Sequence, residues 1–163
     1  MIIGFTQHQI TPPQPPLPAA EPERITVAIN SSTDIVVARQ HGRQLSLGCG
    51  CSSTDATLVA TIISELARNA LLYAKDGEIV LEKAVTTGMK GVKIMCYDAG
   101  PGIADIRRAL AGGYSTSGGL GMGLSGVRRL VDAFKLKSGK DGTVVTVTKW
   151  LYRNNPYAGG TRS

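Results

Sequence analysis

The sequence has few aromatic residues and no long apolar run, and its first residues do not show the pattern expected of a secretory leader. Only 5% of its 163 residues are aromatic while 42% are hydrophobic, so the core is expected to be mainly aliphatic. No run approaches the roughly 20 apolar residues that a membrane-spanning helix needs. Residues 1–10 lack the basic start and apolar stretch of a signal peptide. These absences predict a cytoplasmic protein without membrane contact.

Cysteine and histidine are also scarce, with three and two residues respectively. Cys49 and Cys51 flank a single glycine, but no second cysteine pair completes a metal site, and His8 and His41 lack the spacing of metal ligands. We interpret the Cys-Gly-Cys segment as a loop of small residues. A metal or redox pair is the alternative interpretation.

The net charge of +6 is compatible with an acidic or phosphorylated ligand. The basic residues are scattered, however, and no basic run is interleaved with aromatic residues. The sequence therefore does not favour a nucleic-acid partner.

A single domain is expected from the length of the chain. Six of the eight prolines fall within residues 1–22, which favours an extended, disordered tail that cannot join a core; a docking peptide is the alternative. The domain is expected to span residues 23–152. Residues 153–163 are predicted to form a polar C-terminal tail.

Apolar periodicity predicts a strand, two helices, two strands, a glycine-rich stretch, a helix and a strand. Alternation gives the strands 24–30, 78–85, 92–97 and 143–150, and three- and four-residue spacing gives the helices 35–47, 56–74 and 124–134. A short apolar piece lies at 106–110. Turn-connected strands imply a mixed, mostly antiparallel sheet, and helices on one face would complete an α+β, two-layer sandwich.

The helix 56–74 carries two polar residues beside its apolar stripe. Glu65 and Asn69 are four positions apart, so their side chains point the same way. An amide oxygen such as that of Asn69 is a suitable ligand for Mg²⁺. The carboxylate of Glu65, one turn away, can accept a proton from an attacking hydroxyl. An ordinary polar pair on a helix edge is the alternative.

Asp98 directly follows an apolar strand and precedes Gly100 and Gly102. A carboxylate in that position can accept a hydrogen bond from an exocyclic amine such as that of adenine, and the glycines let a ligand approach bare backbone. A plain β-turn is the alternative, since Asp and Gly are turn residues.

A second glycine cluster, with Gly119, Gly121 and Gly123, leads into the helix 124–134. Backbone N–H groups at such a helix start can bind phosphate oxygens. Residues 121–126 also fit the dinucleotide fingerprint, but no strand precedes them directly, so we reject that interpretation. A Walker loop is absent because no Gly-Lys-Ser/Thr occurs.

The order Glu-xxx-Asn, Asp-x-Gly-x-Gly, Gly-x-Gly-x-Gly and Gly-Thr resembles the ATP site of the GHKL superfamily, over residues 24–151. The chain is similar in sequence to the RsbT-type serine/threonine-protein kinases at residues 64–70, 97–103, 113–130 and 142–147. The resemblance implies the Bergerat fold and the use of Mg-ATP. It also implies partners: a STAS-domain antagonist of the RsbS or RsbR kind as substrate, in a stressosome assembly, and an RsbU-like, PP2C-type phosphatase that the released kinase activates.

The resemblance also implies a role for each site residue. Glu65 would orient or deprotonate the attacking serine, Asn69 would ligate Mg²⁺, and Asp98 would accept the adenine amino group. Gly100 and Gly102 would admit the base, Gly119, Gly121 and Gly123 would present amides to the β- and γ-phosphates, and Thr143 would assist adenine recognition through water.

One departure concerns the charge near the γ-phosphate. This family often carries a Lys where the chain has Gly118, and Lys75, Arg68 or Arg128 are the candidate substitutes. Two other functions stay open: an RsbW-like anti-sigma factor kinase, and a docking module that binds nucleotide without catalysis.

Overall fold

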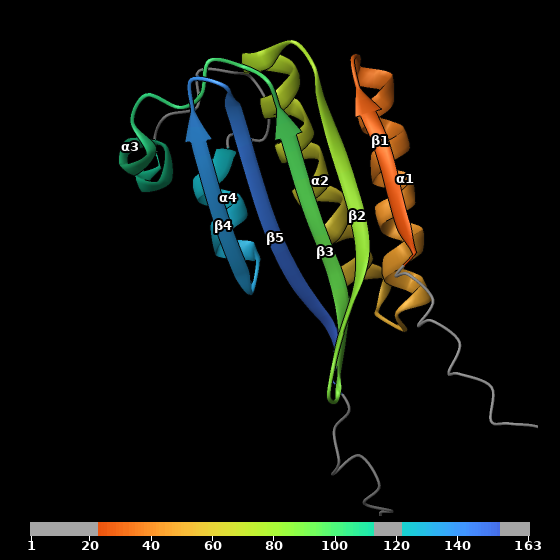
Figure 1. Cartoon of the computed structure of the whole chain (residues 1–163). Coiled ribbons are helices and arrows are strands. Elements are labelled where there is room, and N and C mark those ends of the chain that lie inside the picture. Colours follow the sequence, from red (N-terminus) through yellow and green to blue (C-terminus); the bar gives the residue numbers. More distant parts are fainter. Residues whose placement is uncertain (1–22, 113–121, 154–163) are drawn as a thin grey trace, which may run out of the picture.

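The computed structural model describes residues 23–112 and 122–153. They form a five-stranded sheet with helices on one face, in the strand order β1-β2-β3-β5-β4 (Figure 1). The strands are β1 (Arg24–Ile29), β2 (Gly77–Thr86), β3 (Met89–Asp98), β4 (Ala133–Gly139) and β5 (Gly142–Arg153). The helices are α1 (Ser32–Gly48), α2 (Ser53–Ala74), α3 (Ile106–Ala111) and α4 (Gly123–Leu130). The expected two-layer α+β sandwich is confirmed.

All four strand pairings in the described part of the chain are antiparallel. The expectation of a mixed sheet is therefore narrowed to an antiparallel one. The chain passes from β2 to β3, and from β4 to β5, through tight turns. The strands β3 and β5 are neighbours in the sheet, but α3, α4 and β4 lie between them in the sequence. As a result, the residues after β3 and the hairpin between β4 and β5 lie at the same end of the sheet (Figure 1).

Side chains on the helix-facing side of the sheet alternate with outward-facing ones, as the pleat requires. One row across the sheet on this side consists of Val27, Ile79, Cys96, Val145 and Leu136. The apolar stripe of α2 packs onto these rows, and its residues Ile62, Ile63 and Leu66 are almost fully buried. Burying each such side chain stabilises the fold by roughly 1.5–3 kcal/mol. The predicted aliphatic core is confirmed.

The caps of α1 and α2 follow from short polar side chains. Ser31 and Asp34 form a reciprocal capping box at the start of α1, and Asp34 Oδ2 accepts hydrogen bonds from the backbone N–H groups of Asn30 and Ser31. These hydrogen bonds lower the pKa of the Asp34 carboxyl. Ser52 caps α2 by accepting from the Asp55 backbone N–H at 3.1 Å. Both helices begin about one turn earlier than their apolar residues predict.

The prediction of a helix over 124–134 is wrong at its C-terminal end. The helix α4 ends at Leu130, and β4 begins at Ala133. Phe134 and Leu136 face the core while Lys135 and Lys137 are exposed, so this segment alternates. Phe134 lies four positions after Leu130, a spacing that also fits a helix. Pairing with β5, where Phe134 lies opposite Val147, determines the observed strand.

No helix of the described residues is both long and apolar enough to cross a membrane.

Candidate functional site

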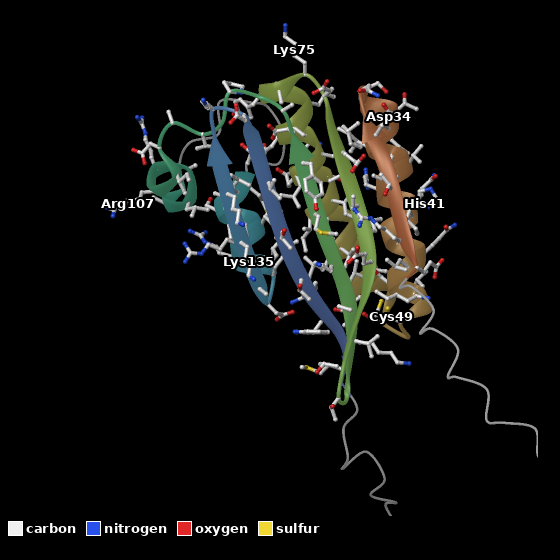
Figure 2. The ribbon with its side chains drawn as sticks, viewed as in Figure 1. Asp34, His41, Cys49, Lys75, Arg107 and Lys135 are labelled. Atoms are coloured by element: carbon white, nitrogen blue, oxygen red, sulfur yellow. The ribbon has the colours of Figure 1, made fainter. Side chains whose placement is uncertain are left out.

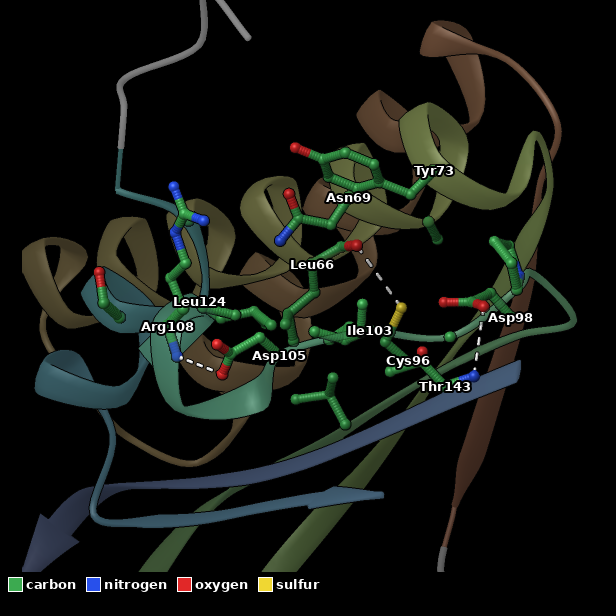
Figure 3. Close-up of a pocket in the computed structure, with 18 of the residues that line it drawn as sticks. Leu66, Asn69, Tyr73, Cys96, Asp98, Ile103, Asp105, Arg108, Leu124 and Thr143 are labelled. Carbon is green, nitrogen blue, oxygen red and sulfur yellow. Dashed lines mark hydrogen bonds between the residues drawn. The ribbon is translucent and has the colours of Figure 1, made fainter. Parts of the chain in front are cut away.

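A cavity of about 390 Å³ opens between the C-terminal half of α2, the end of β3, the helices α3 and α4, and β5 (Figure 3). Pockets of this size hold small molecules and cofactors. Five residues singled out from the sequence line it: Asn69, Asp98, Gly102, Gly123 and Thr143. They come from separate parts of the chain, and the fold brings them around one cavity.

The other predicted site residues are placed differently. Glu65 and Gly100 are close in sequence to lining residues but do not line the cavity themselves. Gly119 and Gly121 lie outside the described residues. The structure therefore brings five of the nine predicted site residues around one cavity. The role of each of them stays a prediction.

Asp98 stands at one end of the cavity with its two carboxylate oxygens in different surroundings. Oδ1 accepts hydrogen bonds from the backbone N–H groups of Gly100, at 3.0 Å, and Thr143, at 3.2 Å. Oδ2 accepts none from the described residues, and Figure 3 shows an oxygen of this carboxylate pointing into the cavity. One oxygen is thus held by the protein, and the other is available to a ligand that donates a hydrogen bond.

A chain of hydrogen bonds fixes the loop after Asp98 to the β4–β5 hairpin. The Ile103 backbone N–H donates to Ser138 Oγ at 2.7 Å, and Ser138 Oγ shares a 2.8 Å hydrogen bond with Thr143 Oγ1. Ser138 was not singled out from the sequence, since an isolated serine near a turn is unremarkable until the pairing of β4 and β5 is known. This network makes the Asp98 end of the cavity rigid before any ligand arrives.

Close packing explains the two glycines of this loop. A Cβ atom at Gly102 would lie 2.1 Å from the Gly139 carbonyl oxygen, and Gly102 has a φ of +81°. A Cβ at Gly100 would lie 2.7 Å from Ala74 Cβ. Both positions exclude a side chain because the protein itself fills the space. From the sequence, we expected the glycines to admit a ligand and did not consider packing within the protein.

The floor of the cavity is apolar. Leu66, Ile103 and Val145 line it, together with Cys96, whose Sγ donates to the Leu66 carbonyl oxygen at 3.5 Å. Burial, and to a lesser extent the negative charge of Asp98, raise the pKa of the Cys96 thiol to about 12. The thiol is therefore neutral near pH 7 and serves as packing, so a flat apolar group such as a nucleobase is well matched to this floor.

Asn69 lies further along the cavity from Asp98, toward the end where Arg108 and Leu124 lie, which we call the mouth (Figure 3). Its side chain makes no hydrogen bond to any residue that the structure describes, and it is partly exposed. One turn earlier on α2, Glu65 is 4% exposed, and its Oε1 accepts from Arg68 Nη1 at 2.8 Å. Burial of a carboxylate is costly unless it is paired, and Arg68 provides that pairing.

At the mouth, α4 begins with Gly123, which has a φ of +50° and contacts no neighbour at its absent Cβ position. The first backbone N–H groups of a helix lack partners within the helix and carry its positive end. Ser125 on the same turn also lines the cavity. This end can therefore receive negative charge, while the Asp98 end receives a hydrogen-bond donor.

Sequence reasoning did not assign four polar lining residues to the site: Tyr73, Asp105, Arg108 and Ser125. Tyr73 was interpreted only as part of the apolar stripe of α2. The other three belong to short helices or to a helix cap, whose orientation is set by tertiary packing, so no local pattern could place them at a cavity.

Comparisons with known proteins agree with this geometry. Residues 54–153 match the sequence model of the family described as histidine kinase-, DNA gyrase B-, and HSP90-like ATPase. The serine/threonine-protein kinase RsbT of Bacillus subtilis (strain 168) is 49% identical over 126 residues, which cover 77% of this chain and 95% of that protein.

A solved structure of the RsbU and RsbW domains of a Mycobacterium tuberculosis protein is similar with a TM-score of 0.55 and 22% identity. The match covers 80% of this chain but only 32% of that one, so it shows the shared fold alone. The family match and the identity to RsbT show that the chain belongs to the histidine kinase-, DNA gyrase B- and HSP90-like ATPases and, within them, to the ATP-dependent serine/threonine-protein kinases of the RsbT type.

Proposed function

We propose that this kinase transfers the γ-phosphoryl group of Mg-ATP to a serine of a STAS-domain antagonist and, once released, activates a PP2C-type phosphatase. The observation that carries the proposal is the polarity of the cavity. Asp98 offers a free acceptor oxygen at one end, and Asn69 and the start of α4 stand at the other. The identity to RsbT over nearly its whole length supports the choice of partners.

In this proposal the adenine ring lies on the apolar floor, and its amino group donates to Asp98 Oδ2. The backbone N–H of Thr143 keeps the carboxylate in position through Oδ1, and its hydroxyl assists from the hydrogen-bonded pair with Ser138. An adenine amine facing a charged acceptor gives a stronger hydrogen bond than a neutral pair would. This end of the cavity selects the base.

The phosphates would extend toward Asn69 and Gly123. The predicted role of Gly119 and Gly121 is to present amides to the same phosphates. Asn69 fits a magnesium site because its amide oxygen is hard, near the mouth and without a partner in the described structure. Magnesium, when bound, would neutralise charge on the phosphate oxygens. The backbone N–H groups at the start of α4 would add hydrogen bonds to the same oxygens.

Glu65 would receive the proton of the attacking serine hydroxyl. It precedes Asn69 by one turn of α2, and Arg68 holds its Oε1 at 2.8 Å, which fixes the carboxylate in one orientation. Phosphoryl transfer depends mainly on positioning and charge stabilisation, so one oriented carboxylate is sufficient as the proton acceptor.

The test is to incubate the chain with Mg-ATP and a STAS-domain protein from the same source, and to map phosphorylation by mass spectrometry. We expect one phosphoserine on the partner, which should disappear with EDTA or when that serine is replaced by alanine. If the partner binds and ATP binds but no phosphoserine forms, the chain is a docking module and the proposal fails.

A second arm addresses the phosphatase. The chain should raise the activity of a PP2C-type phosphatase when free, and lose this effect when the unphosphorylated STAS protein is added in excess. Binding of a sigma factor instead of the phosphatase would support an RsbW-like function and contradict the proposal.

A further inference from the structure

A cavity that receives a triphosphate needs positive charge near its mouth. Among the lining residues that the structure describes, three belong to the acidic and basic types: Asp98, Asp105 and Arg108. Arg108 is the single cation of this set. Its place therefore decides how the chain can balance the charge of a phosphate tail.

The three basic residues considered from the sequence do not meet this need. Arg68 does not line the cavity, and its Nη1 lies 2.8 Å from Glu65 Oε1. Lys75 caps the C-terminus of α2 with a φ of 70°, and in Figure 2 it points away from the molecule. Arg128 is exposed on the last turn of α4, and neither it nor Lys75 lines the cavity.

Arg108 is held at the cavity by the short helix α3. Asp105 caps this helix by accepting a hydrogen bond from the Arg108 backbone N–H at 3.0 Å. Asp105 and Ala109 line the cavity as well, so one side of α3 forms a wall of it. Neighbouring Arg107 is exposed and does not line the cavity. Two adjacent arginines on the same helix thus differ in whether they reach the site.

Figure 3 shows the side chains of Arg108 and Asn69 extending toward the same side of the cavity, from α3 and α2, with Asp98 at the far end. A nucleotide whose base meets Asp98 would extend its phosphates toward these two residues. The planar guanidinium group presents paired N–H donors that match two phosphate oxygens, which a lysine cannot do.

We propose that Arg108 binds the β- and γ-phosphate oxygens of ATP and is the residue that distinguishes the triphosphate from nucleotides with a shorter tail. This inference rests on the proposed placement of the nucleotide with its base at Asp98. It assigns to α3 a task that no motif in the sequence indicated. The same cation also stabilises the charge that shifts among the phosphate oxygens during transfer.

The experiment compares Arg108→Ala with the matched control Arg107→Ala, which removes the same side chain from the same helix one position earlier. Dissociation constants for Mg-ATP, ADP, AMP and adenosine are measured by calorimetry for the full chain. Circular dichroism and thermal unfolding show whether each variant is folded. We expect both variants to fold, because both arginines are exposed.

We expect Arg108→Ala to weaken ATP binding about 10- to 100-fold, as for a lost hydrogen bond to a charged group, with AMP and adenosine unchanged within about twofold. Arg107→Ala should bind all four ligands like the parent chain. Arg108→Lys should recover part of the ATP affinity because it restores the charge but not the paired donors.

Equal ATP affinities for Arg108→Ala and Arg107→Ala would overturn the proposal. An equal loss for ATP and adenosine in Arg108→Ala would also overturn it, because the residue would then support the wall and not the phosphates. These results are separate from those on the protein substrate: a parent chain that binds ATP yet phosphorylates no STAS protein leaves the binding comparison intact.

Discussion

The two ends of the cavity proposed to bind ATP are built in different ways. At the Asp98 end, strand tips and a hairpin supply a carboxylate whose Oδ1 is already hydrogen-bonded to two backbone N–H groups, with Ser138 and Thr143 linked beside it. At the opposite end, Asn69 makes no hydrogen bond within the described structure, and α3 and α4 are short helices.

This difference suggests that nucleotide affinity and phosphoryl transfer depend on different ends of the cavity. An acceptor that is already held in place costs little conformational free energy to order when a ligand binds. The Asp98 end should therefore set the affinity for the base. In the proposed placement of the nucleotide, groups at the other end would contact its phosphates, so that end should set the response to the phosphates and the rate of transfer. Changes at the two ends should therefore give different patterns with adenosine, ATP and the protein substrate.

The largest effect is expected for Glu65→Gln. The amide can still accept from Arg68 but cannot take up a proton, so the rate of phosphorylation of the STAS protein should fall by about 10²–10⁴-fold. The ATP dissociation constant should stay within about twofold, because Glu65 does not line the cavity. Phosphorylation kinetics under saturating ATP measure the first quantity and calorimetry the second.

The matched control is Glu78→Gln, which makes the same change at an exposed position of β2. Glu65→Asp restores a carboxylate and should recover part of the rate. Transfer by Glu65→Gln at more than about one tenth of the parental rate would contradict a role as proton acceptor.

Asp98→Asn should give the next largest effect, on affinity and not on the step of transfer. With the amide oxygen serving the two backbone N–H donors, its NH₂ group faces the adenine amine, and two donors oppose each other. We expect adenosine and ATP to bind about 10- to 100-fold more weakly, both by the same factor.

Asp141→Asn is the control for Asp98→Asn, since it removes the same charge in the β4–β5 turn, where Asn is equally suitable. Equal binding of ATP to Asp98→Asn and to the parent chain would refute the assignment of Asp98 to adenine. A loss for ATP without a loss for adenosine would reverse the orientation of the nucleotide in the cavity.

The sequence predicted the Asp98 end better than the mouth. The strand β3 and the turn residues after it have strong local patterns, and the order of the motifs resembles a known ATP site, so Asp98, Gly102 and Thr143 could be assigned to one site from the sequence. The strand β4 was missed because Phe134 shares a helical spacing with Leu130. Without β4, the Ser138–Thr143 pair could not be seen.

The mouth depends on how short elements pack, which local patterns do not encode. The helix α3 has six residues, and its orientation follows from the loop before it, where Gly102 lies against Gly139. The sequence offered several cations and no means of ranking them. The three that it suggested all fail to line the cavity, whereas Arg108 does.

A smaller effect at the adenine end is expected for Thr143→Val. This change keeps the shape and the backbone N–H to Asp98 but removes the hydroxyl that pairs with Ser138. Adenosine and ATP should both bind about 2- to 10-fold more weakly, as for the loss of one neutral hydrogen bond. Thr146→Val, on the same strand, is the control. If ATP alone were affected, Thr143 would belong to the phosphate end.

The reactivity of Cys96 tests whether water reaches the Asp98 end of the cavity. The unfolded thiol has a pKa of 9.0, whereas burial and the charge of Asp98 raise the pKa of Cys96 to about 12. At pH 8 its thiolate fraction should therefore be about 1000-fold lower than in the unfolded chain, so iodoacetamide should label Cys96 far more slowly than after unfolding in urea.

The stability that this shift contributes is fully present below pH 9.0 and is lost as the pH rises toward the folded value. Peptide mass spectrometry separates Cys96 from the half-exposed Cys51, which should react first even though its own pKa is raised. Asp98→Asn should speed the labelling of Cys96 modestly, because it removes the second cause of the shift. Labelling of Cys96 as fast as Cys51 in the parent chain would mean that water reaches the floor of the cavity, and the contrast between a closed adenine end and an open mouth would fail.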